Sequence, residues 1–483
     1  RARIFFRPTV AFAPHPPQDR ATGGRDGMGD ITGPGIALLL LDAALAEMLL
    51  FAGVLFLIGG LDDLAVDIAW MRLRRPPLRL ADLPPAPPRR IALFVPAWDE
   101  AHVIGAMLDA ALSRYVHDDY RIWVGCYPND RATIDAVAAV AQRDARVRLA
   151  IGGRDGPTTK ADCLNTLWRA LRRADARDGA VTDAIVLHDA EDVVDPHEAI
   201  VFAAMLDRFA LVQLPVVPLL DRGATLVAGS YADEFAESHG RAMVVRDALG
   251  AAMPLAGVGC AIRRDALERL AGGDDAPFDP GSLTEDYELG LRVAALGLPA
   301  CFVRVRGPDG LIATRAYFPD RIRDAVVQKA RWMIGIALAG WDRTGWGARR
   351  PAEYWMRLRD RRAPLAVLAL TLAYAALAGG ALSWGLHALL GGEMPVPGGA
   401  VRWLLTIDAL LLGWRLAMRC GATAAIYGAR EGARAAPRAV VGNIVAMLAA
   451  RRALVRYVAM LAGGAPRWDK TAHRFPAVLP HDA

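Results

Sequence analysis

Three long apolar segments constrain the fold of this 483-residue chain more than any other feature. They occupy residues 36–60, 364–390 and 401–418, and a helix needs about 20 mostly apolar residues to cross a bilayer. The third segment is the weakest, because arginines lie near both of its ends and must reach the interfaces. The first segment contains Asp42 and Glu47, so we expect these acids near an interface or against another helix.

The composition favours a soluble domain that is joined to a few membrane segments. Hydrophobic residues make up 54% of the chain and charged residues 23%. A wholly soluble enzyme rarely reaches this apolar content, and a polytopic transporter carries fewer charges. Disordered and fibrous classes are excluded. The five cysteines form no CxxC pair, which argues against a disulfide framework or a zinc site and favours a reducing compartment.

The basic residues are unevenly distributed around the apolar segments. The net charge of +5 does not require a nucleic-acid partner, because arginines that flank membrane spans are an ordinary source of such an excess. Residues 26–71 and 391–400 contain no Lys or Arg, whereas arginines cluster within 72–79, 357–362 and 419–434. The positive-inside rule therefore predicts a cytoplasmic location for residues 61–362 and for the C-terminus.

The predicted organisation has a large domain between the first and second spans. Residues 1–33 are rich in Arg, Pro and Gly and are expected to be disordered. An apolar stretch near the C-terminus is interrupted by arginines and favours an interfacial amphipathic helix over a span. The predicted segments are: transmembrane helix 34–61, linker 62–90, catalytic domain 91–345, basic juxtamembrane segment 346–362, transmembrane helices 363–390 and 401–418, interfacial helix 436–461 and tail 462–483.

The large domain alternates between apolar β-rich runs and helical stretches. We expect helices at 101–112 and 135–145, between runs typical of buried strands. This rhythm predicts a parallel sheet that is covered on both faces, with the active site at the carboxyl ends of the strands. The predicted strands are 91–97, 121–127, 146–152, 184–190 and 209–217.

Lysine is rare in this chain and therefore informative. Of 57 basic residues, only Lys160, Lys329 and Lys470 are lysines. A lysine that is retained against this arginine bias favours a role that a compact point charge fills and a planar guanidinium does not. Chance retention is the alternative.

Several acidic residues follow predicted strands. Glu100 lies in PAWDE and Asp130 in YPND, although helix capping and turn formation also explain such residues. Lys160 lies between a Gly-rich turn and a helix, a place that suits a phosphate. HDAED holds Asp189, Glu191 and Asp192, whose mutual repulsion favours a bound Mg²⁺ or Mn²⁺. We expect the neighbouring histidine to pack or to donate hydrogen bonds.

Two further motifs lie closer to the second span. Asp286 follows Thr-Glu at the start of an amphipathic helix, where it is either a general base or a first-turn acid favoured by the helix dipole. Gln328, Arg331 and Trp332 of QKARW span about one helical turn and can share a face. Arginine suits a diphosphate and tryptophan a sugar ring, but the same pair is also a normal membrane anchor.

The order of these motifs resembles the membrane-bound, synthase-like branch of family 2 glycosyltransferases, which includes cellulose, chitin and hyaluronan synthases. The resemblance covers about residues 90–335, and the pair TED and QxxRW is its most specific part. The segments YPND, GPTTKADCLN, HDAEDVVDP and WDKTAHRFP are most similar to the bacteriophage adsorption protein B group of inner-membrane glycosyltransferases.

The resemblance implies a GT-A-like, Rossmann-like α/β domain with a mixed or parallel sheet, flanked by transmembrane helices. It implies an inverting transferase that uses a nucleotide sugar, expected to be a UDP-sugar, to make or extend an envelope glycan. The implied location is the bacterial inner membrane with the catalytic domain in the cytoplasm, and an outer-membrane export partner is a further expectation. The implied residues are Asp286, Gln328, Arg331 and Trp332 for catalysis; Glu100, Asp130, Lys160 and Asp189 for the donor; Gln213, Pro215, Gly259 and Cys260 for the acceptor; and Asp189 and Glu191 for Mg²⁺ or Mn²⁺.

Alternatives remain open at the level of sequence. The usual DxD motif is DAE here, so Asp192 can replace Glu191 as the metal ligand. A second enzymatic function is the transfer of one sugar to a polyprenyl phosphate, and a non-enzymatic one is a membrane scaffold or receptor component.

Overall fold

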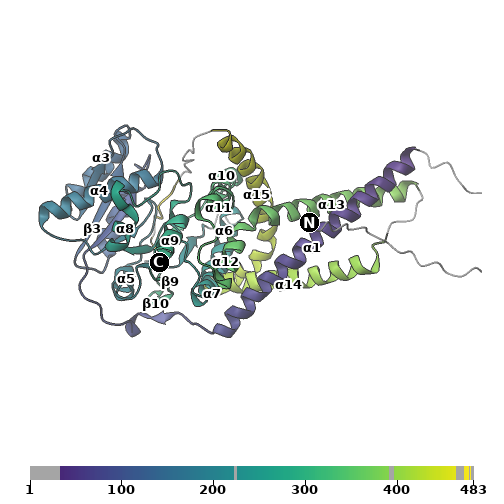
Figure 1. Ribbon diagram of the computed structural model, residues 1–483, viewed down its shortest axis with the longest axis horizontal. Helices are drawn as coiled ribbons and strands as arrows, with labels where there is room; N and C mark the ends of the chain where they lie inside the picture. Colours follow the sequence, from purple (N-terminus) through teal and green to yellow (C-terminus); the bar gives the residue numbers. More distant parts are fainter. Residues whose placement is uncertain (1–32, 222–225, 391–395, 464–472, 478, 480–483) are drawn as a thin grey trace, which may run out of the picture.

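The computed structural model describes residues 33–221, 226–390, 396–463, 473–477 and 479. An α/β domain lies at one end of the molecule, and long helices project from its other end (Figure 1). Residues 1–32 of the predicted leader lie outside the described residues, as do most of the predicted tail and Lys470.

Three helices of the described chain are long and apolar enough to cross a membrane. They are α1 (Gly33–Leu73), α13 (Ala363–Leu390) and α14 (Gly399–Tyr427), and each contains one of the predicted apolar segments. Asp42 of α1 contacts α13, where its carboxylate accepts hydrogen bonds from Ser383 and His387. This acid therefore faces another helix, as expected for a carboxylate inside a span.

The predicted linker 62–90 is helical in its first part, because α1 continues to Leu73. Three carboxylates on this extension have partners on other helices. Asp62 accepts a hydrogen bond from Trp355 and pairs with Arg359. Asp67 lies 2.7 Å from the Arg241 guanidinium and accepts a hydrogen bond from a tryptophan of α14. Tertiary ion pairs thus extend the helix beyond its apolar segment.

The α/β domain is built on a seven-stranded sheet with the order β4-β3-β2-β5-β8-β6-β9. Strands β2 to β5 are parallel, whereas β8 is antiparallel to both of its neighbours. The sheet is therefore mixed. Its strands are β2 (Ile91–Pro96), β3 (Tyr120–Cys126), β4 (Val147–Ile151), β5 (Ala184–Leu187), β6 (Leu211–Gln213), β8 (Cys260–Arg263) and β9 (Ala300–Phe302).

The predicted strand 209–217 is two strands that belong to different sheets. β6 ends at Gln213, and β7 (Val216–Leu219) pairs with β12 (Thr314–Tyr317) in a separate two-stranded sheet. Pro215 lies between them and has no N–H for a ladder, which explains the break. A third small sheet contains β1 (Leu78–Arg79), β10 (Val305–Gly307) and β11 (Gly310–Leu311).

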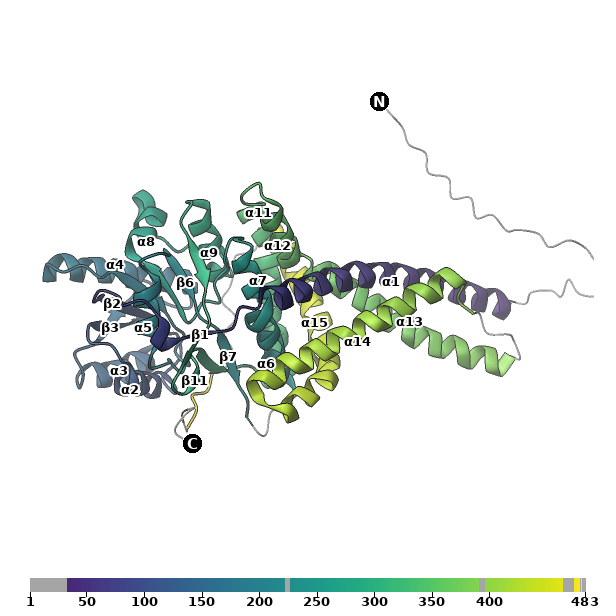
Figure 2. The same ribbon diagram turned by 90° about the horizontal axis from the view of Figure 1, so that it is seen from below.

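Helices cover both faces of the large sheet, as predicted. Figure 2 shows α4 (Lys160–Asp178) and α8 (Arg264–Ala271) on one side of the strands and α2 (Ile104–Arg114) and α3 (Arg131–Ala141) on the other. The first side also includes α9 (Glu285–Ala295), and the second includes α5 (Glu198–Met205). Each face buries its own apolar core, which holds the strand ends in fixed positions.

A layer of helices lies between the sheet domain and the long helices. α15 runs across the ends of the long helices rather than along them (Figure 1). Small residues at 432, 435, 442, 449 and 453 form its buried side. An apolar exposed side suits a membrane interface, and the interfacial location stays a prediction. The layer comprises α6 (Val227–Glu237), the π-helix η2 (Ser238–Ala242), α7 (Met243–Ala248), α10 (Ile322–Trp332), the π-helix η4 (Met333–Leu338), α11 (Ala339–Thr344), α12 (Pro351–Arg361) and α15 (Ala429–Leu461).

The acidic residues of α6 connect this layer to its neighbours. Glu237 lies 2.9 Å from each of three guanidinium groups, those of Arg241, Arg415 and Arg419. Asp233 pairs with Arg438 of α15 at 3.2 Å, and both side chains are almost fully buried. These pairs join α6 to α14 and α15, and hence the α/β domain to the long apolar helices.

We expect Arg438→Ala to destabilise this layer by about 3–5 kcal/mol, because the substitution leaves the buried Asp233 carboxylate without its cationic partner. Hydrogen–deuterium exchange should become faster in α6 and α15. Arg430→Ala, an exposed arginine at the start of the same helix, is the control and should leave exchange unchanged. Equal protection of α6 and α15 against exchange in the two variants would contradict a stabilising role of the Asp233–Arg438 pair.

Candidate active site

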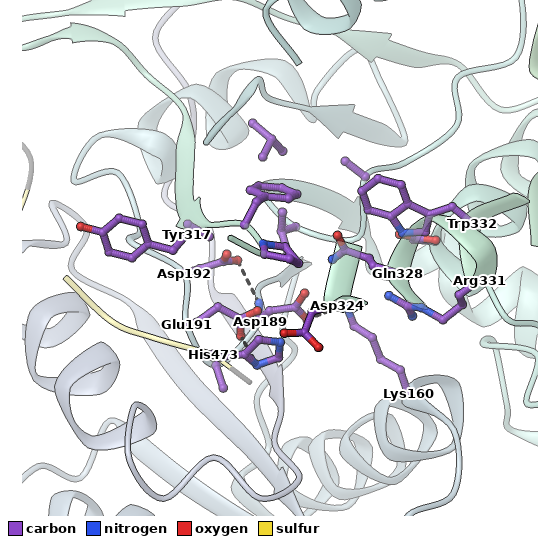
Figure 3. A pocket seen from close by; sticks show the side chains of 18 of the residues that line it. Lys160, Asp189, Glu191, Asp192, Tyr317, Asp324, Gln328, Arg331, Trp332 and His473 are labelled. Atoms are coloured by element: carbon purple, nitrogen blue, oxygen red, sulfur yellow. Dashed lines mark hydrogen bonds and ion pairs between the residues drawn. The ribbon is translucent and has the colours of Figure 1, made fainter. Parts of the chain in front are cut away.

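A cavity of about 390 Å³ lies where the carboxyl ends of β2 and β5 meet α9 and α10 (Figure 3). Most of the sequence-predicted residues line it, although they are distant in the chain. The predicted residues that line this cavity are Glu100, Lys160, Asp189, Glu191, Asp286, Gln328, Arg331 and Trp332.

The turn that follows β5 is held by a buried histidine. His188 contacts Asp192 at 3.1 Å and Glu198 at 2.8 Å. Asp192 also accepts a hydrogen bond from the backbone N–H of Asp189. Although burial opposes the charged imidazole, these two carboxylates raise the pKa of His188 to about 10. His188 and Asp192 therefore shape the turn, while Glu191 is directed toward a different partner.

Glu191 belongs to a cluster with Glu100 and His473. One ligand atom from each of these three residues lies within 4.8 Å of the other two. The imidazole Nδ1 of His473 is 2.8 Å from Glu100 and 3.3 Å from Glu191. Burial raises the pKa of Glu191 to about 8, and the neighbouring carboxylates raise the pKa of His473 to about 9 against the effect of burial. Two carboxylate oxygens and an imidazole nitrogen at this spacing fit a divalent cation.

Lys160 is the first residue of α4 and reaches the same cavity. Its ammonium lies 2.6 Å from Asp189 and 4.0 Å from Glu285, and donates a hydrogen bond to the carbonyl of Gly257. Burial opposes the charge of Lys160, but the surrounding carboxylates raise its pKa above the usual range. Asp189, a predicted metal ligand, thus faces Lys160 here rather than the cluster of Glu100, Glu191 and His473. Burial also raises the pKa of Glu285, to about 7.

Asp286 is the second residue of α9, and its carboxylate reaches the cavity wall. One carboxylate oxygen accepts a hydrogen bond from the backbone N–H of Tyr287 at 2.7 Å. The other lies beside Gly257, where a Cβ atom would be 2.5 Å away. Gly257 has a φ of +78°, which also favours glycine. Burial raises the pKa of Asp286, which brings a carboxylate closer to the range of a general base.

The QKARW segment forms the end of α10. Gln328, Arg331 and Trp332 all line the cavity, so the prediction that they share a face agrees with the structure. Lys329 points elsewhere: it pairs with Glu234 of α6 and lies 4.9 Å from the ring centroid of Tyr231. This lysine therefore helps to fix α10 against α6.

The predicted acceptor residues lie behind the cavity wall. The side chain of Gln213 is fully buried, donates to Val258 and accepts from Ala256. Cys260 is buried within β8, and a Cβ atom on Gly259 would collide with Thr314. These residues are outside the lining of the cavity and hold the loop before β8. That these residues line an acceptor site stays a prediction.

The carboxylate of Asp130 is engaged by backbone groups, and the residue is not part of the cavity lining. It caps α3 through the N–H of Thr133 and accepts a second hydrogen bond from the N–H of Asp99. Asp130 thus acts as a helix cap in the structure, and contact with a nucleotide stays a prediction.

Two features of the cavity were missed in the sequence. His473 lies in WDKTAHRFP. The lysine and the resemblance single out this segment, but the sequence does not identify its histidine as a metal ligand. An aromatic group around Phe318 forms another part of the wall, with Phe235 at a centroid distance of 4.9 Å and Tyr317 next in sequence. No sequence periodicity marks this aromatic group, because the elements that contribute to it, β12, α6 and α10, are distant from one another in the chain.

The comparison with known proteins now decides the family. The family described as glycosyltransferase like family 2 matches residues 87–335, which is more than half of the chain. The chain belongs to glycosyltransferase family 2. It is 34% identical over 471 residues to bacteriophage adsorption protein B of Escherichia coli K12, and the same values hold for bacteriophage N4 adsorption protein B of Escherichia coli O157:H7. The alignment covers 88% of this chain and 61% of each relative, so this chain spans less than two thirds of their length.

A solved structure supports the GT-A-like fold of this family 2 glycosyltransferase. The mannosyltransferase PcManGT of Pyrobaculum calidifontis, in complex with GDP-Man and Mn²⁺, has a TM-score of 0.53 and is 17% identical. The match covers 85% of this chain and 99% of PcManGT. A GT-A-like domain flanked by apolar helices is therefore confirmed.

We expect His473→Gln to weaken the binding of Mn²⁺ in the presence of nucleoside diphosphate by about 10–100-fold, because the substitution removes the one nitrogen of the cluster. Glu191→Gln should have a similar effect. His197→Gln is a matched control, since the His197 side chain is as exposed as that of His473 and lies outside the cavity lining. Isothermal titration measures the affinity. A large loss of Mn²⁺ affinity in Asp192→Ala, with only a small loss in Glu191→Gln, would identify Asp192 rather than Glu191 as the metal ligand.

Proposed function

We propose that this chain is an inverting glycosyltransferase of the bacterial inner membrane that transfers a sugar from a nucleotide sugar to a glycan hydroxyl. The observation that carries this proposal is the presence of a cationic lysine, a cation-binding cluster and a carboxylate of raised pKa in one cavity. The family and the order of the motifs support the same conclusion.

The donor end of the cavity suits a sugar diphosphate. Lys160 and Arg331 offer positive charge where the diphosphate leaves, and Glu100, Glu191 and His473 would hold a divalent cation. When bound, that cation neutralises the charge that develops on the leaving diphosphate. An imidazole ligand favours Mn²⁺ over Mg²⁺, which is usually held by oxygen ligands and water. UDP is the nucleotide proposed, on the basis of the resemblance.

Asp286 is the proposed general base. Its carboxylate takes the proton of the acceptor hydroxyl while that oxygen forms a bond to the anomeric carbon of the donor. The bond between this carbon and the diphosphate oxygen breaks on the opposite face, which inverts the configuration. The electron pair leaves with the diphosphate, next to the positive charge of Lys160 and Arg331.

The acceptor end of the cavity is aromatic and acidic. Tyr317, Phe318 and Trp332 present rings on which a sugar can stack, and Asp320 and Asp324 offer hydrogen-bond acceptors for hydroxyl groups. Arg321 and Arg474 lie beside these acids, so charge alone does not select between a glycan and a polyprenyl phosphate. The aromatic rings and the resemblance carried by TED and QxxRW favour a glycan. The relatives are named for bacteriophage adsorption, which is consistent with a product in the cell envelope. An outer-membrane export partner stays a prediction.

The general test of the proposal is purification of the full chain in lipid and incubation with a panel of nucleotide sugars. Release of the nucleoside diphosphate from one of them, dependent on Mn²⁺ or Mg²⁺, supports an enzyme. Intact donors across the panel would favour a scaffold or receptor component.

Asp286→Asn should lower the rate of transfer by about 10²–10⁴-fold, because the amide cannot accept the proton. Donor affinity should change little, since shape is preserved. Asp265→Asn is the matched control, because Asp265 is the second residue of α8 just as Asp286 is the second residue of α9. A role at the helix terminus predicts the same small effect in both variants. Turnover and donor binding are measured on the same preparations.

For the topology, a reporter fused after Gly398 should report the periplasm, and one fused after Gly463 should report the cytoplasm. The basis is the absence of Lys and Arg from residues 391–400 and their accumulation on the other sides of the spans. A cytoplasmic signal at Gly398 would overturn the proposed orientation and the proposed cytoplasmic active site.

A further inference from the structure

The orientation of the Asp286 carboxylate depends on the residue that follows it. The backbone N–H of Tyr287 donates to a carboxylate oxygen of Asp286 at 2.7 Å. A change in the position of residue 287 therefore moves the hydrogen-bond donor that orients the proposed base. The side chain of Tyr287 does not reach the cavity and is 4% exposed.

The phenol of Tyr287 is bound by a helix that leads into the membrane. Its O–H donates to Asp360 at 2.9 Å. Asp360 lies near the end of α12, three residues before Ala363, the first residue of α13. Arg246 of α7 holds the same carboxylate with both of its terminal nitrogens, at 2.8 and 2.9 Å. The bidentate geometry fixes the plane of the Asp360 carboxylate. Helices α7, α9 and α12 lie next to one another in Figure 2.

The other side of the Asp286 carboxylate is connected to the same helix. Arg246 also donates to the carbonyl of Ala252, and the N–H of Ala252 donates to Glu353 of α12 at 2.7 Å. Ala252 begins the segment that reaches Gly257, which lies against the second oxygen of Asp286. Farther along α9, Gly290 packs directly against the carbonyl of Met253. Both walls that enclose the carboxylate are thus anchored on α12.

We propose that Tyr287 and Asp360 are positioning residues that hold the general base in its reactive orientation from the juxtamembrane helix α12. This inference rests on the proposed role of Asp286. Misplacement of a reacting group by about 1 Å costs up to about 10²-fold in rate, so the loss of one hydrogen bond at this place affects the chemical step. The cluster of Glu100, Glu191 and His473 lies on other elements, and Lys160 touches this network through the carbonyl of Gly257 alone among the contacts described above.

The test is Tyr287→Phe in the full chain, reconstituted in lipid. We expect kcat for transfer to fall by about 10–100-fold, while the donor KM and the affinity for Mn²⁺ stay within about twofold. Asp360→Asn, which leaves Arg246 without its charged partner, should act in the same direction. It also serves as the second variant if Tyr287→Phe does not fold. Tyr120→Phe is the matched control, because Tyr120 is buried in β3, accepts a hydrogen bond from Arg146, and lies far from α12 in the fold.

A double-mutant comparison separates positioning from general destabilisation. In an Asp286→Asn background, Tyr287→Phe should cause no further loss of the residual rate, because no base remains to be oriented. An equal loss in both backgrounds, or an unchanged kcat in the single variant, would overturn the proposal. If Asp286→Asn itself keeps near-normal turnover, the proposed role of Asp286 as general base is wrong. The single Asp286 variant shows this directly, so a failure of the base is distinguished from a failure of the positioning residues.

Discussion

A carboxylate that is removed from water requires a positive charge or a hydrogen-bond donor next to it, and this requirement organises the whole molecule. In the cavity, Lys160 and His473 lie among Asp189, Glu191 and Glu100. In the layer next to the membrane helices, arginines from several helices surround the acids of α6 and of the extended α1. The first set of charges is open to a ligand, whereas the second is enclosed by packed helices. The same physical rule therefore produces a reactive site in one place and a structural joint in the other.

The structural joint fixes the α/β domain to the long apolar helices through buried charge pairs. Glu237 contacts arginines of the π-helix η2 and of α14, and Lys329 joins α10 to α6 from within the QKARW segment. Residues of the same motif thus have different functions: Arg331 faces the cavity, while its near neighbour Lys329 faces the supporting helix. The rarity of lysine singles out this motif in the sequence, but only the structure shows that the Lys329 ammonium points to Glu234.

The sequence predicted the class of the fold and the three long apolar helices, and most of the residues that it singled out line the cavity, because these features depend on local patterns. Strand ends of a parallel sheet meet at one edge, so Glu100, Lys160 and Asp189 were placed together without knowledge of any contact. Local patterns are insufficient where distant contacts decide. Gln213 and Cys260 are buried in β6 and β8, outside the cavity lining. The helix α1 extends beyond its apolar part because its acids meet arginines from α12 and η2. His473 was missed because only the folded chain brings it to β2.

The position of His473 has a consequence for how the enzyme is made. Glu100 follows the first strand of the large sheet, whereas His473 follows all three candidate spans and α15. A ribosome that has synthesised the complete sheet domain has therefore not yet supplied the nitrogen ligand of the cluster. The three side chains of the cluster can therefore come together only after the last of the long apolar helices has been synthesised. A chain that is still incomplete has the strands of the sheet but lacks the imidazole of this cluster.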